Sequence, residues 1–257
     1  MRKIVITGAA TGIGKTTALA CARAGFFVIA ADRNSHGLRE LQALLPPHRL
    51  ETHLADLSQP EVYTSFISEL YGTYSHRALH ALINNTGPDN EPGAQAHSGS
   101  APAESSPVSL KSLKCLSKDF AQRELHAPHA RCIINITAQT VHGDGDGDDC
   151  GIGYRDNRYA VIGLTEANAW NFAPRVRVNA VARAAASGLA TDSAADVHAA
   201  DHQGIPLGQR HMIARHRGTR AAGHAEGVAD VVMFLLSEQS RHLTGKVIAV
   251  GQGAGRC

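Results

Sequence analysis

The sequence lacks a long hydrophobic run, a large net charge and any closely spaced pair of cysteines. No apolar run approaches the roughly 20 residues of a membrane-spanning helix, so we expect no membrane segment. The formal net charge is only +2, which argues against a nucleic-acid or membrane surface. The five cysteines form no C-x-x-C motif, a distribution typical of reduced thiols, so we expect a cytoplasmic protein.

The usual metal-binding patterns are also missing. The 15 histidines are scattered and form neither H-x-H nor H-E-x-x-H, the spacings that bring imidazoles together on one ion. The acidic run "GDGDGDD" fails as an EF-hand calcium loop that begins at Asp144. Its sixth and twelfth positions would be Asp149 and Arg155, where the loop needs glycine and glutamate. We therefore expect no metal site and interpret the run as a solvated acidic loop.

The length and hydrophobic content predict one globular domain that spans residues 1–257. The chain is 43% hydrophobic, which is ordinary for a globular protein. Seven apolar, β-branched runs predict strands: "KIVITG", "FFVIAAD", "RLETHLAD", "LHALINNTG", "RCIINITA", "RVRVNAVA" and "KVIAVG". Between some of these runs lie the segments "GKTTALACARAG" and "GVADVVMFLLSEQ", whose apolar residues recur at helical spacing. Strands that alternate with helices pair in parallel, so we expect a doubly wound α/β sheet of the Rossmann type, with helices on both faces.

Two segments interrupt this pattern. Residues 88–107 are rich in Pro, Gly, Ser and Ala and predict a flexible loop. Residues 182–224 are irregular and are expected to lie on the substrate side of the sheet.

A glycine-rich segment, "TGAATGIGKTTALA", follows the first predicted strand and leads into a helix. Gly8, Gly12 and Gly14 allow a tight turn, which brings the backbone and a helix N-terminus close to a pyrophosphate. An ordinary tight turn is the alternative reading. Asp32 ends the next strand, where a carboxylate accepts hydrogen bonds from ribose and repels a 2′-phosphate. This favours NAD(H) over NADP(H), although Arg33 offers a charge that can pair with a phosphate.

Together these features resemble the short-chain dehydrogenase/reductase family. "TGAATGIG" is similar to the family's TGxxxGIG cofactor loop, which adds Thr11 and Ile13 to the expected cofactor contacts. "LADLS" resembles the adenine-contacting pair, at Asp56 and Leu57, and "INNTG" resembles the NNAG motif, at Asn84. The resemblance implies an NAD(P)-dependent oxidoreductase that acts on a small molecule. It also implies a homo-oligomer, a dimer or tetramer assembled through two long helices.

The segment "YRDNRYAVIGLTEANA" resembles the YxxxK helix that carries the family's catalytic tyrosine and lysine. The resemblance makes Tyr154 the general acid–base, with Arg158 in the lysine position one helical turn away. The fixed charge of arginine favours a phenolate and lies where the family grips the nicotinamide ribose, but its planar head is not equivalent to an ammonium.

Other catalytic positions depart from the family. Ser109 stands where the family has asparagine, and Ala138 stands where it has serine. Arg183 replaces the proline of a Pro-Gly pair. Thr140 and His142 follow the strand that ends near Ala138 and are the candidates to replace the missing serine, each with an ordinary loop role as the alternative.

Three functions remain open. The first is an NAD(P)-dependent oxidoreductase for ketones or secondary alcohols, an atypical enzyme suited to a biosynthetic tailoring step. The second is a non-redox enzyme on the same scaffold, a cyclase, dehydratase or epimerase. A halohydrin dehalogenase shares the tyrosine–arginine pair, but it lacks the glycine loop and needs the serine. The third is a dinucleotide-binding regulator without catalytic activity.

Overall fold

The computed structural model describes residues 1–72, 79–85, 110–123, 131–138, 152–183 and 225–250, with side chains for these except 138 and 152–158. Seven strands form one sheet: β1 Lys3–Thr7, β2 Phe27–Asp32, β3 Leu50–Leu54, β4 Ala81–Asn85, β5 Arg131–Ala138, β6 Val176–Arg183 and β7 Val247–Val250. The helices are α1 Gly12–Arg23, α2 Ser35–Leu44, α3 Pro60–Tyr71, α4 Leu110–Gln122, α5 Ile152–Phe172 and α7 Ala225–Leu236, followed by the short 3-10 helix η2 Glu238–Ser240.

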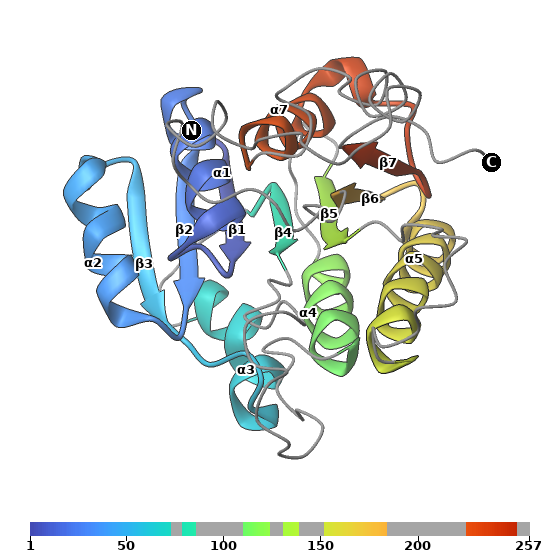
Figure 1. Cartoon of the computed structure of the whole chain (residues 1–257). Coiled ribbons are helices and arrows are strands. Elements are labelled where there is room, and N and C mark those ends of the chain that lie inside the picture. Colours follow the sequence, from blue (N-terminus) through green and yellow to red (C-terminus); the bar gives the residue numbers. More distant parts are fainter. Residues whose placement is uncertain (73–78, 86–109, 124–130, 139–151, 184–224, 251–257) are drawn as a thin grey trace, which may run out of the picture.

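All seven strands run parallel, in the order β3-β2-β1-β4-β5-β6-β7 (Figure 1). The chain first builds outward from β1 to β3, then crosses back and places β4 on the other side of β1. The order therefore reverses between β1 and β4. In open parallel sheets, ligands bind at such a reversal, beyond the carboxyl ends of the strands.

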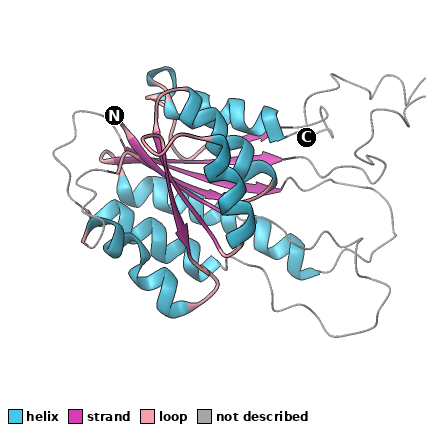
Figure 2. Ribbon diagram, turned by 90° about the vertical axis from the view of Figure 1, so that its left-hand side faces the viewer, coloured by secondary structure: helices cyan, strands magenta, loops and turns pink. Residues whose placement is uncertain are grey.

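Helices cover both faces of the sheet (Figure 2). Apolar residues of α1, α2 and α7 form one core with one side of the strands. Those of α3, α4 and α5 form a second core with the other side. Successive strand residues point to opposite faces, so each strand contributes to both cores. Ile4 and Ile6 face α1, for example, while Val5 faces the α3–α5 layer.

The predicted doubly wound fold is confirmed, and each of the seven apolar runs matches one observed strand, with β6 extending one residue beyond its run to Arg183. The central strands are buried along almost their whole length, whereas the edge strand β3 is partly exposed. Residues 88–107 and all but Ala182 and Arg183 of 182–224 lie outside the described residues. Among the helices that are described, none combines the length and the apolarity needed to cross a membrane.

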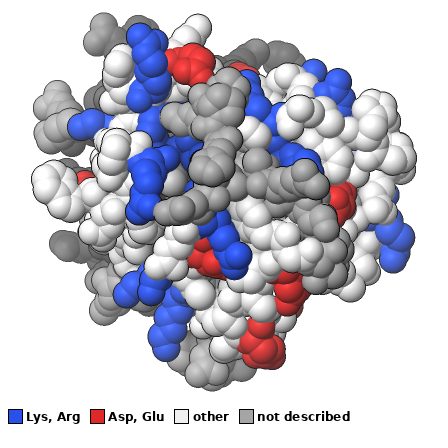
Figure 3. Space-filling view, turned by 180° about the vertical axis from the view of Figure 1, so that it is seen from behind, with Lys and Arg blue, Asp and Glu red and all other residues white. Residues whose placement is uncertain are grey.

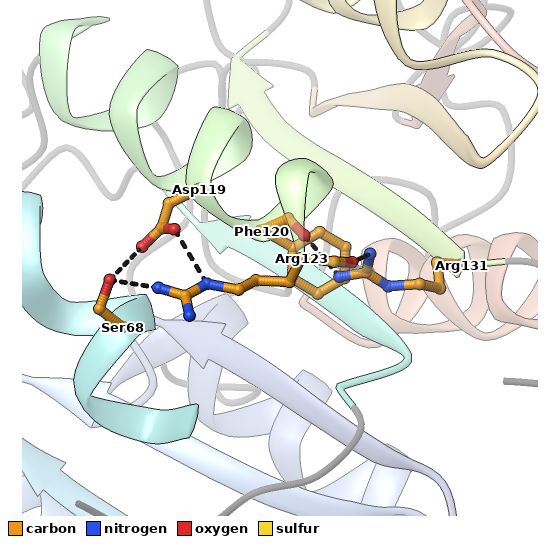
Figure 4. Close-up of polar contacts among 5 residues, drawn as sticks. All are labelled: Ser68, Asp119, Phe120, Arg123 and Arg131. Carbon is orange, nitrogen blue, oxygen red and sulfur yellow. Dashed lines mark hydrogen bonds and ion pairs between the residues drawn. The ribbon is translucent and has the colours of Figure 1, made fainter. Parts of the chain in front are cut away.

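Two buried arginines hold helix ends against the sheet at the amino ends of β5 and β6. Arg131 donates hydrogen bonds to the carbonyl oxygens of Phe120, in the last turn of α4, and of Arg123, just after it (Figure 4), and to that of Leu79. Its guanidinium also lies 4.0 Å from the ring centroid of Phe120. Desolvation by burial lowers the pKa of Arg131. Its hydrogen bonds all go to neutral carbonyl oxygens.

Arg177 likewise holds a helix end against the sheet, on the opposite face. It donates to the carbonyl oxygens of Leu235, in the last turn of α7, and of Ser240 and Leu243, which follow that helix. Unpaired carbonyls at a helix C-terminus carry partial negative charge, which a cation stabilises. Both arginines therefore have a structural explanation, far from the carboxyl edge of the sheet.

Candidate functional site

The turn between β1 and α1 requires glycine at two positions for different reasons. Gly8 has φ +62°, in the left-handed region that favours glycine, and a Cβ there would lie 2.7 Å from the Asn85 carbonyl oxygen. A Cβ on Gly14 would lie only 1.9 Å from the Gly8 carbonyl oxygen. Gly12 also has a positive φ, +49°, but a Cβ there would meet nothing within 4 Å. The turn therefore leaves no room for a side chain at Gly8 or Gly14, whereas the space beside Gly12 is open.

Two side chains from neighbouring strands fix this turn. The Asn85 side-chain amide donates a 2.9 Å hydrogen bond to the Gly8 carbonyl oxygen. On the other side, Asp32 Oδ2 accepts a 2.9 Å hydrogen bond from the backbone N–H of Ala10. The turn is therefore anchored to both strands that flank β1, namely β4 and β2.

In the described part of the chain, no hydrogen bond from the N-cap side chain occupies the N-terminus of α1, so its N–H groups can donate to an anion. Thr11 is its N-cap, is exposed, and makes no side-chain cap hydrogen bond. No acidic residue lies in the first turn, and Lys15 in that turn pairs with Glu40 at 2.8 Å. Ile13 packs its side chain against the core beneath. Free N–H groups, the positive end of the helix dipole and the open space at Gly12 fit the pyrophosphate of a dinucleotide.

A second group of predicted contacts lies beyond the carboxyl ends of β2 and β3. Asp32 accepts one backbone N–H on each carboxylate oxygen, from Ala10 and from Asn34. A carboxylate has about four acceptor positions, so about two remain for ribose hydroxyls. Arg33 is exposed beside it.

Asp56 and Leu57 differ in what their side chains do. The Ser58 hydroxyl donates to Asp56 and, with smaller contributions that include the charge of Arg33, holds the pKa of Asp56 below its usual range. The Leu57 side chain is buried in the core with Phe66 and Ile67. Only its backbone is therefore positioned to contact a ligand at this edge.

Asn84 faces away from the glycine turn. Its buried amide donates to Asn135 Oδ1 at 2.8 Å and to the Ser117 hydroxyl at 3.4 Å, while its own Oδ1 finds no hydrogen-bond partner among the described residues. Asn135 donates in turn to Thr165 on α5 at 2.9 Å. This chain of bonds joins β4 and β5 to α4 and α5, the helix that carries Tyr154. The prediction that Asn84 contacts a cofactor stays a prediction.

The predicted catalytic residues are placed in part. Tyr154 and Arg158 lie one turn apart near the start of α5, and their side chains are outside the described set. Ala138 is the last residue of β5. Thr140 and His142 lie outside the described residues.

Sequence reasoning missed Asn85 and the Asp32–Ala10 bond. The signal for Asn85 was present, because two consecutive asparagines at a strand end must point to opposite faces of the sheet. Nothing in the sequence indicates that the second amide reaches Gly8, which lies 77 positions earlier in the chain.

Comparison with known proteins extends over nearly the whole chain. Residues 8–255 match the family described as enoyl-(acyl carrier protein) reductase. An uncharacterized oxidoreductase of Mycobacterium tuberculosis is 29% identical over 265 residues, covering 97% of this chain and 90% of that protein. A short chain dehydrogenase/reductase of Aspergillus oryzae is 28% identical over 255 residues, covering 97% and 93%. A short-chain dehydrogenase/reductase structure from Brucella melitensis has a TM-score of 0.72 at 20% identity, covering 100% of this chain and 97% of that one, a likeness of fold.

Proposed function

Because the chain belongs to the short-chain dehydrogenase/reductase family of NAD(P)-dependent oxidoreductases, we propose that it transfers hydride between NAD(H) and a ketone or secondary alcohol. The observation that carries this proposal is the intact glycine turn. Gly8 and Gly14 leave no room for a side chain, and Asn85 and Asp32 hold the turn from both sides. The dinucleotide would bring the hydride chemistry.

The preference for NAD(H) over NADP(H) rests on Asp32. Its carboxylate keeps acceptor capacity for ribose hydroxyls at the end of β2, where it would repel a 2′-phosphate. The nearby charge of Arg33 is offset by Asp56, whose pKa it helps to lower.

The catalytic half of the site is atypical. Tyr154 would give a proton to the carbonyl oxygen and take it back in the reverse reaction. Arg158, one turn along α5, would stabilise the phenolate and hold the nicotinamide ribose. Thr140 or His142 would donate a hydrogen bond to the substrate oxygen in place of the missing serine hydroxyl at Ala138. A site with so few of the usual groups suits a narrow biosynthetic tailoring step.

The partners in this proposal are a small-molecule substrate and further copies of the chain. Trp170 on α5 is 86% exposed and Tyr159, on the same helix, is 54% exposed, which supports association through this helix. On the face shown in Figure 3, the basic side chains of the described residues are interspersed with acidic and neutral ones. That distribution does not favour a nucleic-acid partner. The free thiols of Cys21, Cys115 and Cys132 fit a reducing compartment such as the cytoplasm.

Calorimetric titration with NADH and NADPH tests the cofactor half. We expect NADH to bind at least about tenfold more tightly than NADPH, and Gly14→Ala to abolish binding because its Cβ would overlap the Gly8 carbonyl oxygen. Gly163→Ala is the matched control: this glycine lies within α5 with nothing within 4 Å of the added Cβ. The control should bind NADH normally. Failure of the wild type to bind either nucleotide would overturn the proposal.

Turnover of NADH with a ketone distinguishes a redox enzyme from a non-redox enzyme or a regulator. If NADH binds, oxidation of NADH at 340 nm in the presence of ketones should be lost in Tyr154→Phe while NADH affinity is kept. Binding with no turnover on any ketone would favour the alternatives, for which the departures at Ala138 and Arg158 are the supporting observation.

A further inference from the structure

Arg183 is a cation at the carboxyl edge of the sheet that pairs with none of the described residues. It is the last residue of β6 and is partly buried. No hydrogen bond or ion pair joins its guanidinium to any residue in the part of the chain that the structure describes. A partly desolvated charge is costly unless something pairs with it, so an unpaired position of this kind calls for an explanation.

The other two arginines on these strands show how the sheet treats a structural arginine. Arg131 and Arg177 lie at the amino ends of β5 and β6, and each donates three or more hydrogen bonds to backbone carbonyls (Figure 4 shows Arg131). Among the residues that the structure describes, Arg183 donates to no such carbonyl and caps no helix. Hydrogen bonds to backbone carbonyls therefore do not explain the charge of Arg183 as they explain those of Arg131 and Arg177.

The register places Arg183 beside the reaction site. Its backbone pairs with Ala138 of β5 on one side and with Val250 of β7 on the other. Ala138 occupies the position of the family's catalytic serine and carries only a methyl group. By strand alternation Arg183 shares a sheet face with Val181, which packs in the core of α1 and α7. The glycine turn leads into α1, so Arg183 lies on the same face and the same edge as the proposed cofactor site.

Strand spacing separates Arg183 from the cofactor's phosphates. The sheet order puts β4 and β5 between β1 and β6, so β6 lies three strand spacings, or roughly 14 Å, from β1. The pyrophosphate belongs at α1, after β1, and a ribose 2′-phosphate would lie further away, beyond β2. An anion at Arg183 would therefore not be one of the dinucleotide's own phosphates.

We propose that Arg183 binds an anionic group of the substrate, a carboxylate or a phosphate, next to the carbonyl that is reduced. The inference rests on the proposed function and adds the substrate class to it. The guanidinium is permanently charged and presents paired N–H donors that match the two oxygens of either anion. Binding at a fixed point beside Ala138 would orient a substrate in a site that lacks the serine hydroxyl.

Equilibrium binding to the protein saturated with NAD⁺ tests this without turnover, because a ketone cannot accept hydride from the oxidised cofactor. Two pairs of probes differ in charge: acetoacetate against methyl acetoacetate, and dihydroxyacetone phosphate against dihydroxyacetone. In at least one of the two pairs, we expect the anion to bind the wild type about tenfold more tightly than its neutral partner. Arg183→Met should remove most of that preference and Arg183→Lys should keep part of it, while NADH affinity stays within about twofold. Arg175→Met, an exposed arginine just before the other end of β6, is the control.

The proposal fails if wild type prefers neither anion, or if the preference survives in Arg183→Met. A large loss of NADH affinity in Arg183→Met alone would assign the arginine to the cofactor and would also overturn it. If wild type binds no dinucleotide, the proposed function fails separately. Inorganic phosphate titrated into the free wild type and Arg183→Met then still measures whether Arg183 is an anion site, and equal affinities would refute that.

Discussion

The side-chain amide of Asn85 donates a 2.9 Å hydrogen bond to the carbonyl oxygen of Gly8 and thereby ties the end of β4 to the turn that follows β1. The backbone N–H of Asn85 also donates to the Thr7 hydroxyl at 3.1 Å. These two bonds cross the sheet where its strand order reverses, between β1 and β4. The glycine turn is thus held in shape by a residue that need not touch a cofactor itself.

Replacing Asn85 by alanine should therefore weaken cofactor binding. We expect Asn85→Ala to reduce the free energy of unfolding by about 1 to 2 kcal/mol, because it removes one largely buried hydrogen bond and leaves the Gly8 carbonyl unpaired. We expect NADH affinity to fall about tenfold, since the turn is no longer preorganised. Urea unfolding and calorimetry measure the two effects. Asn171→Ala, an exposed asparagine on α5, should change neither. Normal NADH affinity in Asn85→Ala would show that the turn keeps its shape without this bond.

Asp32 should set the cofactor preference. In Asp32→Asn the negative charge is lost, while one side-chain oxygen remains to accept a backbone N–H. We expect the preference for NADH over NADPH to shrink by about tenfold, because repulsion of the 2′-phosphate is removed. Titration of both nucleotides gives the ratio. Asp230→Asn, an exposed aspartate on α7, should leave the ratio unchanged. An unaltered ratio in Asp32→Asn would place the source of selectivity elsewhere.

Most of the fold could be predicted from the sequence because its signals are local. Each strand is a short apolar run, and a chain that alternates such runs with helices has to pair them in parallel. The glycine turn was equally visible, since Gly8, Gly12 and Gly14 lie within seven residues between a strand and a helix.

The contacts that support the site could not be predicted, because they join residues that are distant in the sequence. The Asn84–Asn135–Thr165 chain of hydrogen bonds links three separate elements. The sequence does not distinguish the roles of charged residues in strands, because Arg131 and Arg183 both lie at the ends of apolar runs. Only the structure shows that Arg131 is satisfied by carbonyls of α4 and that Arg183 has no comparable partner among the described residues.

Two buried thiols should make the protein less stable at alkaline pH. Burial raises the pKa of Cys21 from 9.0 to about 12 and that of Cys132 from 9.0 to about 11. Above about pH 9 the unfolded chain ionises both thiols while the folded chain keeps them protonated. The unfolded state then binds fewer protons, so stability is full below about pH 9 and falls as pH rises toward the folded pKa values, by about 1.4 kcal/mol per pH unit for each thiol.

Urea unfolding at about pH 8 and pH 10 measures this loss. The variant with Cys21→Ala and Cys132→Ala should start from a lower stability but lose less of it between the two pH values. Other groups titrate alike in both proteins, so they cancel in the comparison. An equal loss in the two proteins would show that these thiols do not cause the pH dependence.

Trp170 should mark a surface between copies of the chain. It is the single tryptophan of the sequence, and 86% of it is exposed on α5. We expect light scattering to give a multiple of the 27.1 kDa chain mass, and Trp170→Arg to shift the protein toward the monomer because a charge cannot be buried there unpaired. Leu44→Arg, an exposed leucine on α2, is the control. Tryptophan fluorescence should be shielded from acrylamide in the oligomer and quenched after dilution. A monomeric wild type would contradict the prediction.

Arg131 and Arg123 lie on neighbouring elements but should differ in what they contribute to stability (Figure 4). Arg123 pairs with Asp119 at 3.3 Å and donates to the Ser68 hydroxyl at 2.6 Å, yet 38% of its side chain is exposed. Water competes for such a pair, so Arg123→Met should cost less than about 1 kcal/mol. Arg131→Met would leave three carbonyl oxygens unpaired in a buried site and should cost about 2 to 4 kcal/mol.

Urea unfolding of the two variants gives these values, and NADH titration adds a second test. Arg131 begins β5, so it lies at the opposite edge of the sheet from the glycine turn. Its loss should therefore lower stability without changing NADH affinity in the molecules that remain folded. If Arg131→Met were as stable as the wild type, other donors or water would have to satisfy the end of α4. If instead the variant folded stably but bound NADH poorly, the two edges of the sheet would be energetically coupled, and the separation of structural from functional arginines would be wrong.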